Sequence, residues 1–375
     1  MSVRLLHTAD VHLGATFKVL GDRGREQRRQ VEATFARVVA LAISEGVDVV
    51  LIAGDLFDSV AAARSQMGAA AEQLRRLGDA GIPACIIAGN HDPLGEGSAT
   101  LWRDLATAAP ALTVFGATLE ARVFPELDLT VVGRSAHRHL SAESPLGGLP
   151  VSRQTRFLVG LAHGSVQRPD LPAQFGLITS ADIAQSGLDY LALGDWHSTR
   201  EMSSGGVAAW YSGAPEMIDV DEADSGNVCL VTLDAPGRVE VARHRVGRRR
   251  GRQLVVDVAT GGGPEAVWRA VRSEADPELA LTVVLMGLAG IADRINVDRL
   301  REELAGEFFR LEVRDESHLR PDAVDPSQYP ENTILGRFVR LMHEQIAGRE
   351  GEPRTLAEDA LHFGVALLEG KEILG

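Results

Sequence analysis

Short apolar runs alternate with longer amphipathic segments along the first two hundred residues of the chain. In residues 26–45, apolar side chains recur with the period of a helix, at Val31, Phe35, Val38 and Val39. The runs between such segments are short and rich in β-branched residues, which is typical of strands buried on both faces. The pattern predicts strands over residues 3–7, 48–53, 84–88, 129–132, 157–162 and 190–193, and a second helix over residues 64–78. This alternation predicts a layered α/β fold with helices outside the sheet.

The pattern changes after residue 200, where apolar runs come closer together and glycine-containing turns separate them. Antiparallel strands are predicted over residues 208–211, 228–233 and 239–245. Beyond Gly247–Gly251, strands and helices alternate in a way that predicts a small α+β domain. A polar, proline-containing segment and two amphipathic helices, near residues 333–347 and 355–370, follow. We therefore expect three domains, which cover residues 1–248, 249–320 and 321–375.

Composition limits the functions that the chain can have. The 375 residues include 38 Lys and Arg against 52 Asp and Glu, a formal net charge of -14, so bulk electrostatics does not favour binding to nucleic acid. Two cysteines, Cys85 and Cys229, cannot form a disulfide framework or a thiolate zinc cluster. No apolar run is long enough to span a membrane, and Asp10 interrupts the N-terminal segment too early for a secretory signal. We expect a cytoplasmic protein with no membrane contact.

A basic run from Arg243 to Arg252 is either a solvated connector between domains or a contact for phosphates.

Polar side chains that can bind metals follow five of the predicted strands, at the point where each strand ends. These segments are Asp10-Val11-His12, Gly54-Asp55, Gly89-Asn90-His91-Asp92, His163-Gly164 and Gly194-Asp195-Trp196-His197. Ligands of open α/β sheets bind at this carboxyl edge. Carboxylate, amide and imidazole donors without a thiolate suit Mn, Fe, Mg or Zn. Each segment alone is a weak signal, but all five in order predict a metal site.

These segments resemble the motifs of the calcineurin-like metallophosphoesterase superfamily. The openings HTADVHLG (7–14), AGDLFD (53–58) and IAGNHD (87–92) are similar to those of SbcD-type DNA repair exonucleases, and the YhaO-type bacterial branch is the most similar. The resemblance covers about residues 1–215. It implies a metallophosphoesterase β-sandwich flanked by helices, followed by a small α+β capping domain and C-terminal helices.

The resemblance also implies two divalent metal ions, about 4 Å apart and bridged by one carboxylate. By position, the first ion would be held by Asp10, His12, Asp55 and His197, and the second by Asp55, Asn90, His163 and Asp195. We expect Mn²⁺, while Mg²⁺, Fe²⁺ and Zn²⁺ also suit these donors. His91 would contact the phosphate and either stabilise its charge or protonate the leaving oxygen. Asp92 either orients His91 or caps a helix near residues 97–104.

One position departs from the family pattern. The last motif is usually Gly-His-x-His, and here it is Gly194-Asp195-Trp196-His197. A carboxylate is a harder ligand than an imidazole, so Asp195 would shift metal preference towards Mn or Mg. Its added negative charge would also make the metals weaker Lewis acids. Either the site works with an altered metal preference, or its second ion is poorly held.

The resemblance implies hydrolysis of DNA phosphodiester bonds by a water that the two metals activate. Ser165 is the obvious candidate for a covalent nucleophile, but without a His–Asp partner it is better interpreted as a turn residue. The alternatives are a phosphodiesterase or phosphatase for small nucleotides, and a DNA-binding scaffold with a weakened metal centre.

The resemblance implies an SMC-like coiled-coil ATPase as partner. This ATPase would bind the apolar face of the helix at 333–347, although that face could equally pack within its own domain. The resemblance also implies a homodimer, to which the helix at 64–78 could contribute.

Overall fold

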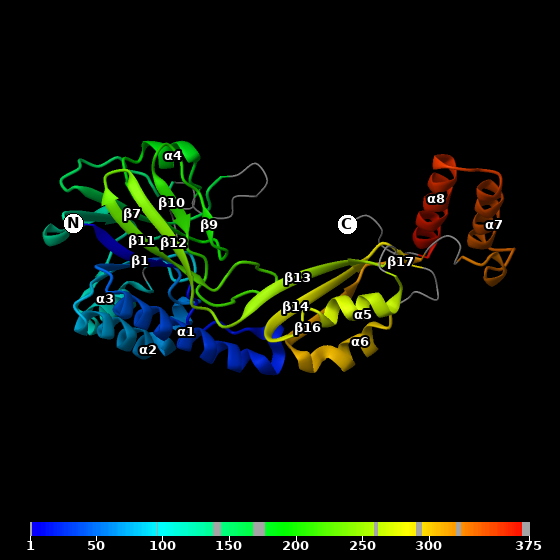
Figure 1. The fold of residues 1–375 in the computed structure, drawn as a ribbon, viewed down its shortest axis with the longest axis horizontal. Coiled ribbons are helices and arrows are strands. Elements are labelled where there is room, and N and C mark those ends of the chain that lie inside the picture. The colour runs from blue at the N-terminus through cyan, green and yellow to red at the C-terminus, as the bar shows by residue number, and fades with distance from the viewer. Residues whose placement is uncertain are drawn as a thin grey trace. The chain divides into compact units, whose positions relative to one another are not determined.

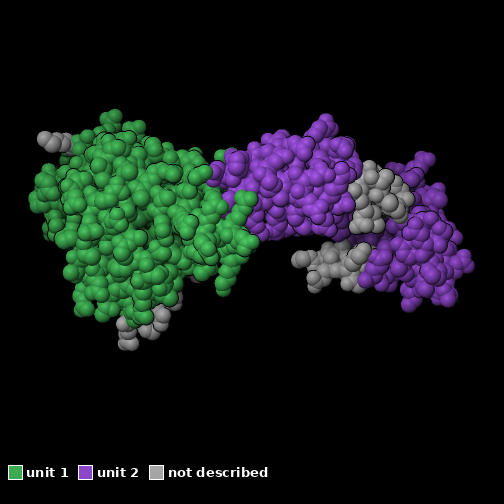
Figure 2. Space-filling view, turned by 90° about the horizontal axis from the view of Figure 1, so that it is seen from below, with its two compact units in different colours: residues 1–251 green, residues 252–375 purple. Residues whose placement is uncertain are grey.

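The computed structural model describes residues 2–95, 97–137, 144–167, 177–258, 262–289, 295–319 and 324–369. The chain divides into two compact units, residues 1–251 and 252–375 (Figures 1 and 2). The division falls within one strand, β13 (Arg250–Asp257). The further division of the second unit into a capping domain and C-terminal helices stays a prediction. None of the described helices has the length and apolar character needed to cross a lipid bilayer.

The first unit contains two six-stranded sheets. The first sheet has the strand order β12 (Arg238–Arg245), β11 (Asn227–Ala235), β1 (Val3–Thr8), β2 (Val49–Ala53), β3 (Ala84–Ile87) and β4 (Leu112–Val114). The second has the order β5 (Glu120–Phe124), β6 (Leu129–Gly133), β7 (Phe157–His163), β8 (Tyr190–Gly194), β10 (Ala208–Tyr211) and β9 (Arg200–Glu201). Strands β1 to β4 run parallel, as do β6, β7, β8 and β10. The carboxyl ends of β1, β2 and β3 therefore meet at one edge, and those of β7 and β8 meet at another.

The two sheets share one hydrophobic core. Leu5, Val49 and Leu51 of the first sheet pack with Val131 and Val159 of the second, and all five are buried. Sheets that bury one face each against the other form a sandwich. The predicted β-sandwich is therefore confirmed.

Helices cover the outer faces of the sandwich (Figure 1). On one side lie α1 (Gly24–Glu45), α2 (Val60–Asp79) and α3 (Ala99–Ala108), and on the other lies α4 (Ser180–Gln185). Short 3-10 helices cover Lys18–Arg23 (η1) and Pro125–Leu127 (η2). The ends of two helices have the expected chemistry: Ser59 caps α2 through its side chain, and Gly46 ends α1 in a left-handed conformation.

One predicted grouping of strands is wrong. The sequence pattern groups residues 208–211 with 228–233 and 239–245 in an antiparallel set, but of these three strands only β11 and β12 pair with each other. β10 instead lies in the other sheet, where it pairs parallel with β8 and antiparallel with β9. Its position depends on pairing with a strand earlier in the chain, which local turns do not determine.

The second unit has its own core. Strands β13, β14 (Asp276–Met286) and β16 (Phe308–Asp315) form a three-stranded sheet, which packs against α5 (Pro264–Arg272) and α6 (Val297–Leu304). The remaining elements are β15 (Leu288–Ala289), β17 (His318–Leu319), η4 (Ala305–Glu307), η6 (Pro326–Gln328), α7 (Ile334–Ala347) and α8 (Glu352–Leu368). Val339 and Ile346 of α7 pack against Leu361 and Val365 of α8 in a separate small core.

Candidate metal centre

The loops that follow β1, β2 and β8 turn through strained backbone conformations. Asp10, His12 and Asp55 have φ angles of 53°, 51° and 49°, and Asp195 has 103°. Residues with side chains rarely adopt positive φ, and such strain is concentrated at functional sites. Hydrogen bonds from Asp10 N to the Gly54 carbonyl and from His12 N to the Asp55 carbonyl, both 3.1 Å, hold two of these loops together.

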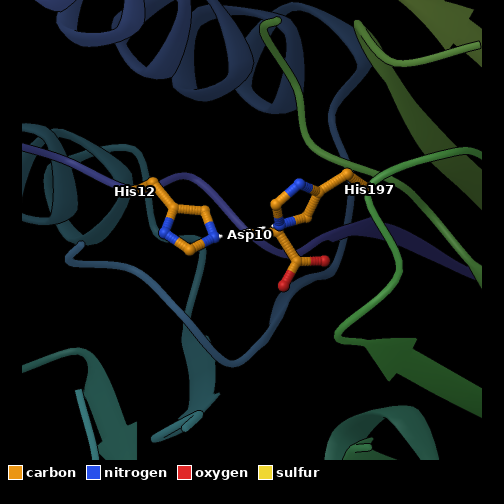
Figure 3. A group of neighbouring side chains, drawn as sticks. All are labelled: Asp10, His12 and His197. Carbon is orange, nitrogen blue, oxygen red and sulfur yellow. Dashed lines mark hydrogen bonds between the residues drawn. The ribbon is translucent and has the colours of Figure 1, made fainter. Parts of the chain in front are cut away.

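Several predicted ligands converge at this edge. The Nε2 atoms of His12 and His197 lie 3.1 Å apart, and the Asp10 carboxylate lies beside them (Figure 3). Asp55 Oδ2 lies 3.7 Å from His12 Nε2 and 3.4 Å from His163 Nε2. Asp55 therefore lies between the two imidazoles, which is the position that a bridging carboxylate needs.

The remaining predicted ligands lie around His163. Asn90 Oδ1 is 2.8 Å from His163 Nε2, and Asp195 Oδ1 is 4.0 Å from the same nitrogen. His163 Nδ1 donates to the Ala53 carbonyl at 2.8 Å, and this bond directs Nε2 towards the carboxylates. Ser165 Oγ donates to Asp195 Oδ2 at 2.6 Å, so Ser165 is the partner of the residue that departs from the family pattern.

His91 and Asp92 lie beside the ligands, but Asp92 has neither of its predicted roles. Its buried carboxylate accepts hydrogen bonds from the backbone N–H of Gly89 (2.8 Å) and of Phe57 (3.0 Å), and it thereby joins two site loops. The cap of α3 is Ser98. His91 is exposed, and its Nδ1 bonds to the Asp58 carbonyl at 3.0 Å instead of to Asp92. A buried carboxylate bonds to nearby backbone donors in preference to an exposed ring.

Two acidic residues outside the predicted ligand set lie beside the histidines. Glu222 Oε2 accepts a hydrogen bond from His197 Nδ1 at 2.8 Å and orients this ring, whereas Asp58 Oδ1 lies 3.6 Å from His12 Nδ1, too far for a hydrogen bond. Asp58 ends the AGDLFD segment, so its position was a usable signal. Glu222 lies in an acidic loop with no strand pattern, and no local signal distinguished it from its neighbours.

The charges of the site depend strongly on one another. Burial raises the pKa of Asp10 above its usual value, although His163 and His197 oppose this. Burial would raise the pKa of Asp55 too, but His163, His12 and His91 together outweigh it and hold that pKa below its usual range. Burial would lower the pKa of His163, yet the Asp55, Asp10 and Asp195 carboxylates together raise it to about 10. The buried carboxylates at this edge thus need positive charge nearby, and either protons or metal cations can supply that charge.

The donors present fit divalent metal ions. Two groups, Asp10–His12–His197 and Asp10–Asp55–His163, each bring three possible ligand atoms within 4.8 Å of one another. Two imidazole nitrogens that face each other at 3.1 Å need a proton or a cation between them. Oxygen and nitrogen donors of this kind suit borderline and hard metals.

Comparison with known proteins agrees with this geometry. Residues 3–158 match the family model described as calcineurin-like phosphoesterase. Residues 3–158 therefore form a calcineurin-like phosphoesterase domain. The matched residues run from β1 into β7, so they include Asp10, Asp55 and Asn90 of the centre. The match of residues 3–158 to this family model and the donor groups Asp10–His12–His197 and Asp10–Asp55–His163 support a centre for two divalent metal ions.

Several proteins to which this chain is similar are named as nucleases or repair proteins. The DNA double-strand break repair protein Mre11 of Aeropyrum pernix is 30% identical over 69% of this chain and 64% of its own length. The uncharacterized metallophosphoesterase YhaO of Bacillus subtilis is 27% identical over 60% of this chain and 56% of its own length. The SbcD subunit of the nuclease SbcCD of Bacillus subtilis is 25% identical over 92% of this chain and 94% of its own length. The chain spans less than two thirds of the first two relatives, and the predicted resemblance to SbcD-type proteins is confirmed.

Proposed function

We propose that this phosphoesterase hydrolyses the phosphodiester bonds of DNA as a metal-dependent exonuclease subunit. The observation that carries the proposal is the convergence of Asp10, His12, His163 and His197 around the carboxylate of Asp55. The names of the Mre11 and SbcD relatives support DNA as the substrate. A DNA substrate would also agree with a cytoplasmic location.

The residues have distinct roles in this proposal. Asp10, His12, Asp55 and His197 would hold one ion, and Asp55, Asn90, His163 and Asp195 the other. Bound metals supply Lewis acidity, which lowers the pKa of water and offsets charge on phosphate oxygens. His91 is exposed at the rim, and its Nδ1 is occupied by the Asp58 carbonyl, so its Nε2 is free to contact phosphate or protonate the leaving oxygen. Asp92, which joins two site loops, and Asp58, whose carbonyl bonds to His91 Nδ1, are positioning residues.

The preferred metal in this proposal is Mn²⁺. Asp195 supports it because a carboxylate replaces an imidazole at the second ion and makes the donor set harder. Ser165 Oγ donates a hydrogen bond to Asp195 Oδ2, and the other oxygen, Oδ1, faces His163. The test is a competition between Mn²⁺ and Zn²⁺ for wild type and Asp195→His. We expect the variant to shift towards Zn²⁺, and an unchanged preference would contradict this role for Asp195.

The proposed partners are DNA and an SMC-like coiled-coil ATPase. On α7, Ile334 and Leu341 are 78% and 55% exposed, whereas Val339 and Ile346 are buried against α8. The predicted apolar face thus divides into a part that packs within the unit and a part that could bind the ATPase. A homodimer through α2 also stays a proposal, and burial of Ala70, Ala71 and Leu74 within the first unit is sufficient to explain those residues.

The nuclease proposal is tested with linear duplex and single-stranded DNA in the presence of Mn²⁺. We expect cleavage by wild type and by Asp104→Asn, an exposed control on α3, and at least a hundredfold loss for Asp55→Ala, given typical losses when a catalytic electrostatic group is removed. Activity on bis-nitrophenyl phosphate but on no DNA would instead favour the small-nucleotide phosphodiesterase. DNA binding with no hydrolysis of any ester would favour the scaffold.

A further inference from the structure

The loop between β10 and β11, residues 212–226, contacts His197 on both its side chain and its backbone. Glu222 Oε2 lies 2.8 Å from His197 Nδ1, and Ala214 N donates to the His197 carbonyl at 2.9 Å. Two residues further on, Thr199 N donates to the Asp224 carbonyl at 3.2 Å. One loop that lies outside the predicted ligand motifs therefore holds this ligand in place.

The same loop carries a second acidic residue, Glu216, which is fully buried. Its carboxylate accepts hydrogen bonds from Thr34 Oγ1 (2.7 Å) and from the backbone N–H groups of Arg248 (2.9 Å) and Arg249 (2.8 Å). Burying a charge without partners is costly, so these donors fix where Glu216 lies. Glu216 thus attaches the loop to α1 and to the end of the first unit.

The segment that ends the first unit, residues 246–251, packs against this loop along its length. Val246 N donates to the Gly226 carbonyl at 2.9 Å, and the buried Arg249 guanidinium donates to Gln27 Oε1 at 2.8 Å and also bonds to Glu26. At Gly251, a Cβ atom would overlap with the Val220 carbonyl, two residues before Glu222. The basic run is therefore an anchored segment, and the interpretation as a solvated connector is wrong for Arg249.

We infer that Glu222 is a positioning residue for the metal centre. We also infer that the position of Glu222 depends on residues 246–251, because this segment holds the 212–226 loop and leads into β13. The inference rests on the proposed metal-dependent function. A carboxylate that accepts the Nδ1–H of a ligand histidine fixes the tautomer and the ring, so that Nε2 faces the metal. Of the two ring nitrogens of His197, Nδ1 bonds to Glu222 at 2.8 Å and Nε2 faces His12 at 3.1 Å, so the bond to Glu222 sets the direction of Nε2.

The first test is calorimetric titration of Mn²⁺ into the metal-free full chain. We expect Glu222→Ala to weaken binding of one ion by about 10- to 100-fold, and Glu222→Gln, which keeps a hydrogen-bond acceptor, to lie between it and wild type. Glu201→Ala removes an exposed glutamate of β9 and serves as the matched control. Because the Glu222 side chain is 32% exposed, thermal unfolding of the metal-free variants should change little. Wild-type affinity for both ions in Glu222→Ala would overturn the positioning role.

The second test alters the loop from the other side. Gly251→Ala should push Val220 and with it Glu222, so Mn²⁺ affinity should fall although Gly251 is no ligand. Gly68→Ala on α2, where nothing lies within 4 Å of the new methyl group, is the control. If Gly251→Ala does not fold, Glu216→Gln, which keeps the side-chain volume, replaces it with the same expectation. Unchanged Mn²⁺ affinity in the folded variant would overturn the coupling. Both titrations lack DNA, so an inactive chain that still shows these differences would contradict only the nuclease proposal.

Discussion

At the scale of single residues, the centre combines strained backbone with crowded glycines. Asp10, His12, Asp55 and Asp195 all have positive φ, and each such residue costs about 1–3 kcal/mol. Hydrogen bonds from Asp10 N and His12 N to carbonyl groups of the loop after β2 offset part of this strain. The strain is consistent with loops that are shaped for ligands at the expense of stability. Sequence could indicate which residues are donors, but their backbone conformations depend on contacts between loops far apart in the chain.

Gly89 provides a test of this crowding. A Cβ atom at position 89 would overlap with Asp55 Oδ1, the oxygen that also accepts a hydrogen bond from His91 N at 2.9 Å. We expect Gly89→Ala to displace the Asp55 carboxylate and to lower Mn²⁺ affinity by at least about tenfold, the size of effect that follows loss of ligand orientation. Calorimetry on the metal-free variant measures this, with Gly68→Ala as control. Equal affinities for the two variants would show that the Asp55 loop adapts.

His7 provides a test of stability against pH. It is fully buried in β1, and its Nδ1 lies 2.8 Å from the hydroxyl of Tyr190 in the other sheet. Burial lowers the pKa of His7 from 6.5 to about 3. Below pH 6.5 the unfolded chain binds a proton that the folded chain does not, so stability falls by about 1.4 kcal/mol per pH unit as pH drops towards 3. His7→Gln, which can still bond Tyr190, should lose this contribution. Urea unfolding of both proteins between about pH 6.5 and 5 measures the difference, and parallel pH dependences would contradict it.

At the scale of elements, the local sequence pattern was sufficient to predict the bounds of elements that are long or fully apolar. α1 and β2 agree with prediction to within two residues, because each has a clear apolar period or run. The missed elements are short or exposed: β4 has three residues, β5 is mostly exposed, α4 has six residues and β9 has two. Too few buried positions lie in such segments to establish a period.

The difference between buried and exposed positions also predicts how much two leucines of α8 contribute to stability. Leu361 is fully buried against α7, whereas Leu356 on the same helix is 69% exposed. We expect Leu361→Ala to lower the free energy of unfolding of the second unit by about 2–5 kcal/mol, and Leu356→Ala to change it by less than about 0.5 kcal/mol. Chemical denaturation followed by circular dichroism measures both. Equal losses would mean that Leu356 is covered in solution, for example by a second copy of the chain.

At the scale of the whole molecule, an acidic chain concentrates part of its negative charge at one functional edge. The net charge of -14 disfavours DNA, yet Asp10 and Asp55 are buried at the centre, where divalent cations would compensate them. Sequence identified the donors of this edge because parallel strands bring their carboxyl ends together. It did not identify Glu222 or the partners of Asp92, since those contacts join loops rather than strand ends.

Removal of metal should therefore affect the two units differently. Each unit has its own core, and the predicted ligands all lie in residues 1–251. A ligand at about a hundred times its dissociation constant stabilises the folded state by about 2.7 kcal/mol per site. We expect Mn²⁺ to raise, and a chelator to lower, the unfolding temperature of the first unit, with that of the second unchanged. Differential scanning calorimetry of the full chain measures both transitions, and Asp55→Asn should abolish most of the shift. A Mn²⁺-dependent shift that persists in Asp55→Asn would place the stabilising ions outside this centre.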